Sequence, residues 1–138
     1  DDVLRQVRKS FPPSPKHASI TYDVRASLSA IKGFDGYLET AFAQIIENAV
    51  RFTPVDGQII VRAYQTGDCV IVEVQDTGVG IGEADLSRIF NTFWRKDAAH
   101  STPGLGLGLS IAQKVIQSYG GDIDVESKLG KGSLFRVK

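Results

Sequence analysis

A carboxylate followed by a glycine-rich turn is the feature of this sequence best suited to hold a ligand. The turn is Asp76-Thr-Gly-Val-Gly-Ile-Gly82, and the run before it, Val70-Ile-Val-Glu-Val-Gln75, alternates as a half-buried strand does. The same period places Asp76 on the apolar face, where a carboxylate is costly unless it is hydrogen-bonded. Glycines at alternate positions let a backbone or a ligand come close. The segment predicts a ligand held against Asp76, and a tight turn capped by this residue is the alternative.

An ionised Asp only accepts hydrogen bonds, which suits the exocyclic amine of adenine. A second group of residues suits the charged part of a nucleotide, because Gln44, Asn48 and Arg51 are spaced to share one stripe of a helix. The amide oxygen of Asn48 is a suitable ligand for Mg²⁺, and Arg51 suits phosphate. Taken alone, this stripe is better explained as a solvated helix flank.

The segment Gly104-Leu-Gly-Leu-Gly-Leu-Ser-Ile111 opens a predicted helix, and the free N–H groups of a helix start bind anions. Its glycine spacing fits neither the dinucleotide-binding fingerprint nor a P-loop. The alternative to an anion-binding site is a glycine-rich hinge without a ligand. Just before it, Phe90-Asn-Thr-Phe-Trp-Arg95 leads from a helix end into a loop. Packing is the simpler explanation for Phe90 and Phe93.

The composition is that of an ordinary globular domain. The 138 residues contain 16 Lys and Arg and 16 Asp and Glu. This balance argues weakly against binding to nucleic acid or membrane through net positive charge. Cys69 is the only cysteine, so no internal disulfide can form, and its place in a strand predicts burial. Because the sequence starts at Asp1 without a methionine, we expect it to be part of a longer protein.

The elements that would position these residues mix helices with antiparallel hairpins. We expect a helix end over residues 1–9, a weak strand over 18–24, a long amphipathic helix ended by Pro54 and Gly57, and strands at about 58–64 and 69–75. A short helix over 83–90, a helix from about 106 to 119, and strands at about 122–127 and 133–137 follow. The inward residues of the two longer helices are Tyr37, Leu38, Ala41, Phe42, Ile45, Ile46, Ala49 and Val50, and then Ile111, Val115, Ile116 and Tyr119.

This order predicts an α+β fold, a two-layer sandwich with a mixed sheet and helices on one face. Three prolines in Phe11-Pro-Pro-Ser-Pro15 interrupt the first helix. We therefore expect residues 1–15 to be the end of an upstream helix with its linker, and residues 16–138 to form one domain.

Together and in this order, the segments resemble the N, G1, F and G2 boxes of the catalytic ATP-binding domain of sensor histidine kinases. That family shares a superfamily, and a Bergerat-type fold, with gyrase, the mismatch-repair ATPases and a heat-shock chaperone. The resemblance runs from about residue 18 to the C-terminus. The boxes read Gln44-Ile-Ile-Glu-Asn-Ala-Val-Arg-Phe-Thr-Pro54, Asp76-Thr-Gly-Val-Gly80, Phe90-Asn-Thr-Phe-Trp-Arg95 and Gly104-Leu-Gly-Leu-Gly-Leu-Ser-Ile111.

The resemblance implies ATP and Mg²⁺ as cofactors. Asn48 would coordinate Mg²⁺, Arg51 would contact the phosphates, and Asp76 would bind the adenine amine, with Gly78 and Gly80 giving clearance for the ring. Residues 91–104, approximately, would form a mobile lid. The remaining implied residues are Gly104, Leu105, Gly106, Leu107 and Gly108 around the phosphates, and Phe90, Phe93, Trp94 and Arg95 in the F box beside the lid.

Two departures from the family pattern bear on the expected activity. Leu105 stands where the family often has Thr or Ser, and Gln44 stands where hydrolysing relatives place a Glu that activates water. We therefore expect slow hydrolysis, with ATP spared for transfer to a side chain. The contexts of His17 and His100 do not match a phosphoacceptor, so the acceptor histidine would lie upstream, on a helical hairpin of the same parent protein.

The resulting expectation is a cytoplasmic kinase domain that donates the γ-phosphate of Mg·ATP to that histidine. A response regulator would act downstream, and no nucleic acid is involved. The chain itself would be monomeric and its parent a homodimer. A serine kinase of the anti-sigma-factor type, or a nucleotide-sensing domain without transferase activity, is the alternative.

Overall fold

The computed structural model describes residues 2–12, 18–25, 35–91 and 108–138. The helices and strands follow one another along the chain much as the sequence pattern predicts. Their order is α1 (Asp2–Ser10), β1 (Ser19–Val24), α2 (Asp35–Phe52), β2 (Gln58–Thr66), β3 (Cys69–Asp76), α3 (Glu83–Leu86), α4 (Gly108–Ser118), β4 (Ile123–Lys128) and β5 (Gly132–Val137).

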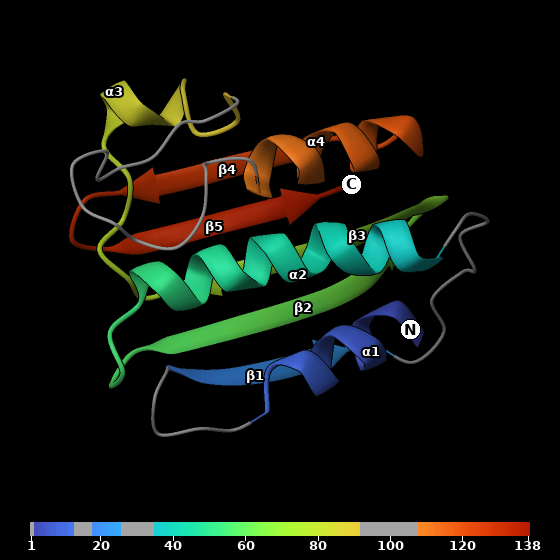
Figure 1. The fold of residues 1–138 in the computed structure, drawn as a ribbon, viewed down its shortest axis with the longest axis horizontal. Helices are drawn as coiled ribbons and strands as arrows, with labels where there is room; N and C mark the ends of the chain where they lie inside the picture. The colour runs from blue at the N-terminus through green and yellow to red at the C-terminus, as the bar shows by residue number, and fades with distance from the viewer. Residues whose placement is uncertain (1, 13–17, 26–34, 92–107) are drawn as a thin grey trace.

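The strands form one sheet in the order β1-β2-β3-β5-β4. The β1–β2 pair is parallel and the other pairs are antiparallel. Figure 1 shows α1, α2 and α4 on the same side of this sheet. The predicted α+β sandwich, with a mixed sheet and helices on one face, is confirmed.

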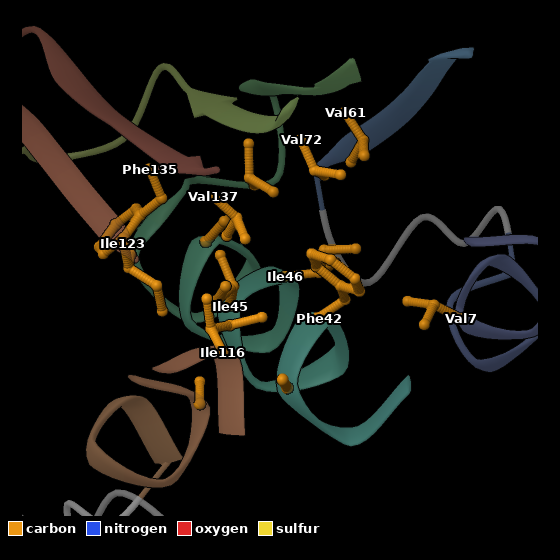
Figure 2. Close-up of a cluster of buried hydrophobic side chains, with 14 of the residues drawn as sticks. Val7, Phe42, Ile45, Ile46, Val61, Val72, Ile116, Ile123, Phe135 and Val137 are labelled. Atoms are coloured by element: carbon orange, nitrogen blue, oxygen red, sulfur yellow. The ribbon is translucent and has the colours of Figure 1, made fainter. Parts of the chain in front are cut away.

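Helix α2 is the centre of the core. Its buried residues recur at the spacing of one helix face, and they are Leu38, Ala41, Phe42, Ile45, Ile46 and Ala49. In Figure 2, Val7 of α1 points toward Phe42 and Ile46 on one side of α2. Ile116 of α4 lies close to Ile45 on another side. Helix α2 is therefore held between α1, α4 and the sheet, which fixes the residues along its length.

Three predicted burials are wrong. Cys69 is exposed because it is the first residue of β3, directly after the β2–β3 turn. Tyr37 is 61% exposed, since it stands at the edge of the apolar stripe in the first turn of α2. Ile111 is 43% exposed, because the buried face of α4 is made by Leu109, Ala112 and Ile116 and residue 111 lies on the opposite face.

Candidate functional site

A row of polar side chains crosses one end of the sheet beneath the helices. Asp76 of β3 pairs with Ser133 of β5, which pairs in turn with Ser127 of β4. Directly paired residues of antiparallel strands point to the same face. The next row in the same direction is Val74, Phe135 and Val125, which belongs to the hydrophobic core. The core is therefore interrupted here by three polar residues side by side.

Asp76 is only 5% exposed, as its predicted position on the apolar face requires. Its Oδ1 accepts a hydrogen bond of 2.8 Å from the backbone N–H of Gly78. Burial raises the pKa of the Asp76 carboxyl, and the backbone amides of Gly78 and Ser133 only partly oppose this. A further hydrogen-bond donor would stabilise the ionised carboxylate, so the site is electrostatically suited to a ligand that donates.

The turn after Asp76 is tied to two other parts of the fold. The backbone N–H of Val79 donates to the carbonyl oxygen of Phe52 at the end of α2, at 3.1 Å, and Gly130 N–H of the β4–β5 hairpin donates to the Val79 carbonyl at 2.8 Å. A Cβ on Gly78 would overlap the Phe52 carbonyl, and a Cβ on Gly80 would overlap that of Lys128. The chain's own packing therefore requires glycine at both positions, while their clearance for an adenine ring stays a prediction.

The polar stripe of α2 runs between the start of α4 and this turn. At one end, the Gln44 side chain lies against Gly108, so closely that a Cβ at position 108 would overlap it. At the other end, Phe52 accepts the bond from the glycine turn. Asn48 is half-buried one helical turn from each. Asn48 therefore lies along α2 between the points where the helix meets the predicted phosphate-binding segment and the predicted base-binding turn.

Arg51 is exposed and forms an ion pair with Glu47, at 3.6 Å between Nη2 and Oε1, one turn back on the same helix. Exposed pairs at this spacing contribute only about 0.3–0.5 kcal/mol. The pair therefore leaves the guanidinium able to move to a stronger anion.

Several predicted site residues lie outside the described part of the chain. Of the F box, Phe90 is described, and it is half-buried against the core. The residues that are not described are Phe93, Trp94, Arg95, Gly104, Leu105, Gly106 and Leu107, most of the predicted lid, and both histidines, His17 and His100.

Sequence reasoning missed Ser127, Ser133 and Thr53. The two serines reach the site only through strand pairing, although glycines flanking Lys131 mark the turn that brings them there. Gly132 has a φ of +95°, and a Cβ there would overlap the backbone oxygen of Asp76. Thr53, next to Phe52, buries a hydroxyl that has no hydrogen-bond partner among the described residues. This end of the fold therefore holds more polar groups than the motifs alone indicate.

In the described ranges, no helix is long and apolar enough to span a bilayer.

Known proteins of one family resemble this chain in sequence and in fold. Residues 35–138 match the family described as histidine kinase-, DNA gyrase B-, and HSP90-like ATPase. The adaptive-response sensory kinase SasA of Synechocystis is 35% identical over 135 residues, which cover 97% of this chain and 35% of that protein. Among solved structures, the mycobacterial sensor histidine kinase MprB gives a TM-score of 0.78 at 27% identity, covering 99% of this chain and 90% of that one.

Full-length ShkA, solved in complex with AMPPNP, gives a TM-score of 0.83 at 31% identity and covers 99% of this chain but 28% of that one. The chain likewise spans 27% of the sensor histidine kinase RppB of Synechocystis and 35% of SasA, so it corresponds to a minor part of these relatives. With the family match extending over α2 and everything after it, the chain belongs to the histidine kinase-, DNA gyrase B- and HSP90-like ATPases, as the catalytic ATPase domain of a sensor histidine kinase.

Proposed function

We propose that this chain binds Mg·ATP and donates the γ-phosphate to a histidine on a separate helical hairpin of a longer protein. The family match and the names of the relatives, which are sensor kinases, support this reaction over serine phosphorylation or nucleotide sensing alone. A response regulator would then receive the phosphoryl group from the histidine. Because ATP is the donor, the domain would act in the cytoplasm.

The observation that carries the proposal is the buried Asp76 at the polar end of the sheet. Its pKa is raised by burial, and a donating ligand would offset the cost of its charge. The exocyclic amine of adenine supplies such a donor. Asp76 would therefore select the base, and the buried Thr53 hydroxyl, which has no partner in the described part of the chain, adds a further polar group at this end of the fold.

The phosphates would lie along α2 toward the start of α4. The half-buried amide oxygen of Asn48 is a hard donor that fits Mg²⁺, which proteins commonly bind through few side chains together with substrate phosphates. Arg51 would exchange its weak pair with Glu47 for the phosphates. Gly108 opens α4 beside Gln44, where free backbone N–H groups suit an anion. Gly104, Leu105, Gly106 and Leu107 would complete this phosphate-binding segment.

Catalysis by these residues would consist of positioning and charge neutralisation. Magnesium, when bound, would neutralise charge that develops on the phosphoryl oxygens. Gln44 carries an amide and cannot take a proton from water as a Glu would, so it would orient the nucleotide without promoting hydrolysis. The attacking imidazole would come from the hairpin, and no residue of this chain would become phosphorylated.

The lid stays part of the proposal. Residues 91–104, with Phe90, Phe93, Trp94 and Arg95 in the F box, would cover the bound nucleotide. Residues 1–15 would connect the domain to the upstream hairpin. In the described structure Leu4 and Val7 of α1 are part of the hydrophobic core, so this connection would leave the domain from a helix that is packed against α2.

A calorimetric titration with ATP in the presence and absence of Mg²⁺ tests the metal assignment. The wild-type chain should bind more tightly with Mg²⁺ by about tenfold, equivalent to about 1.4 kcal/mol. In Asn48→Ala the two affinities should converge, and the same variant should abolish phosphoryl transfer in the longer protein. Thr40→Ala removes an exposed polar group from the same helix and should behave as wild type. An Asn48→Ala chain that keeps the full magnesium dependence would contradict the assignment.

A further inference from the structure

We infer that Ser127 is a positioning residue that fixes the direction of the Ser133 hydroxyl and thereby makes the proposed base-binding site selective for an amino group over an oxo group. The inference rests on the proposed function, because it concerns the same site. Ser127 itself lies one strand further from Asp76 than Ser133 does, on β4. It would act on the ligand through Ser133.

The Ser127 hydroxyl has three neighbours. Its Oγ lies 2.9 Å from the Gly132 carbonyl oxygen and 2.7 Å from Ser133 Oγ, and it accepts a hydrogen bond of 2.7 Å from Ile81 N–H. The Gly132 carbonyl can only accept, so the single Ser127 proton must be donated to it. Ser127 therefore has no proton left for Ser133, and the hydrogen bond between the two serines must be donated by Ser133.

This proton order determines what Ser133 can offer a ligand. Because its proton is held by Ser127, Ser133 Oγ can act only as an acceptor toward any further partner. Asp76 lies directly across the strand pair, on the same face, and accepts as well when it is ionised. Two adjacent acceptors suit the two N–H groups of a 6-aminopurine. They repel the oxygen of a 6-oxopurine, which can only accept at that position.

Ser127 also contacts the glycine turn that follows Asp76. Ile81 lies within the glycine turn, and its bond to Ser127 joins this turn to the sheet edge from a position distant in sequence. Gly130 N–H to the Val79 carbonyl, at 2.8 Å, is a second link between the same two segments. The turn therefore keeps a connection to the hairpin when Ser127 is changed, and loss of the serine should alter selectivity more than folding.

The test compares binding of ADP with binding of inosine diphosphate, which has an oxygen in place of the amine, to the 138-residue chain by calorimetry. The wild-type chain should prefer ADP. Ser127→Thr keeps the hydroxyl, and Ser127→Val has the shape of the Thr side chain without the hydroxyl. Comparing these two variants therefore isolates the effect of the hydroxyl. Ser127→Val should lower the ADP preference about five- to tenfold and Ser127→Thr should retain it. Ser118→Ala, which removes an exposed serine hydroxyl at the end of α4, is the control and should not change it.

A second comparison separates positioning from a purely structural role. In a Ser133→Ala background, Ser127→Val should have little further effect on the ADP preference, because the group through which it acts is absent. Equal preference in the Thr and Val variants, or a full additional loss in the Ser133→Ala background, overturns the inference. If the wild-type chain binds neither diphosphate, both the proposed function and this inference fail. If the chain binds ADP but the Ser127→Val variant keeps the wild-type preference, only the inference fails.

Discussion

At the level of single residues, Asp76 is the group that we propose selects the ligand, and its burial has a cost to the fold. Its carboxyl is buried beside an apolar row of the sheet, and its pKa is raised by that burial. The folded chain therefore holds the Asp76 proton more tightly than the unfolded chain does. By linkage, the contribution of this group to stability is largest at acid pH and is lost as pH rises from the unfolded pKa through the raised folded pKa.

The loss of stability with rising pH that Asp76 contributes predicts how Asp76→Asn should behave without nucleotide. The variant removes the group that loses stability as the pH rises, so its unfolding temperature relative to wild type should increase between about pH 4 and about pH 7. Thermal unfolding of both proteins, followed by circular dichroism at several pH values, measures this difference. A variant that instead becomes relatively less stable with rising pH would show that the Asp76 charge is favourable in the free fold.

At the level of elements, the site depends on contacts between the glycine turn and the β4–β5 hairpin. Gly80 and Gly130 both have positive φ, of +74° and +79°, but only Gly80 faces a backbone atom at the position of a Cβ. Gly130→Ala should cost about 1–2 kcal/mol of unfolding free energy from conformation alone. Gly80→Ala should cost about 2–5 kcal/mol, since overlap with the Lys128 carbonyl adds to the same strain.

Denaturant unfolding of the two variants beside wild type provides the comparison. Equal losses for Gly80→Ala and Gly130→Ala would mean that the turn can move away from the hairpin without penalty. In that case the close packing between these elements would not hold Asp76 in place.

How far the sequence predicts these elements depends on how far apart the interacting residues lie along the chain. The period of α2 and the alternation of β3 are local, and they correctly place Leu38 through Ala49 and the buried Asp76. The row of Asp76, Ser133 and Ser127 depends on the pairing of β3 with β5, which are far apart in sequence and which no local pattern brings together; the local hairpin pattern accounts only for the pairing of β4 with β5. Ile111 was misplaced for a related reason, because its apolar side chain lies on a helix face that the sheet does not cover.

At the level of the whole molecule, the chain is a nucleotide-binding part that would need a partner to complete its reaction. Its longest helix lies between α1, α4 and the sheet, and its polar stripe connects the predicted base and phosphate segments. The order of the four motifs predicted this family from the sequence, and the family match over residues 35–138 confirms it. The ligand-binding roles of the individual site residues, among them those between 92 and 107, stay predictions.

The chain alone should therefore not keep a phosphoryl group. After incubation with Mg·ATP labelled in the γ position, the protein should carry no stable label, because neither His17 nor His100 lies in a phosphoacceptor context. Mass spectrometry after acid-free digestion would locate any label. A phosphorylated His17 or His100 would contradict the proposal that the acceptor lies on another domain.

The central claim, that Asp76 holds the base of an adenine nucleotide, is tested most directly by calorimetric titration of the chain with Mg·ADP. Asp124→Asn, on the exposed side of β4, is the matched control for the same chemical change. Asp76→Asn should weaken binding by about tenfold to a hundredfold, as expected for the loss of a hydrogen bond to a charged group, and the control should bind as wild type does. Unchanged ADP affinity in a folded Asp76→Asn chain would contradict the claim.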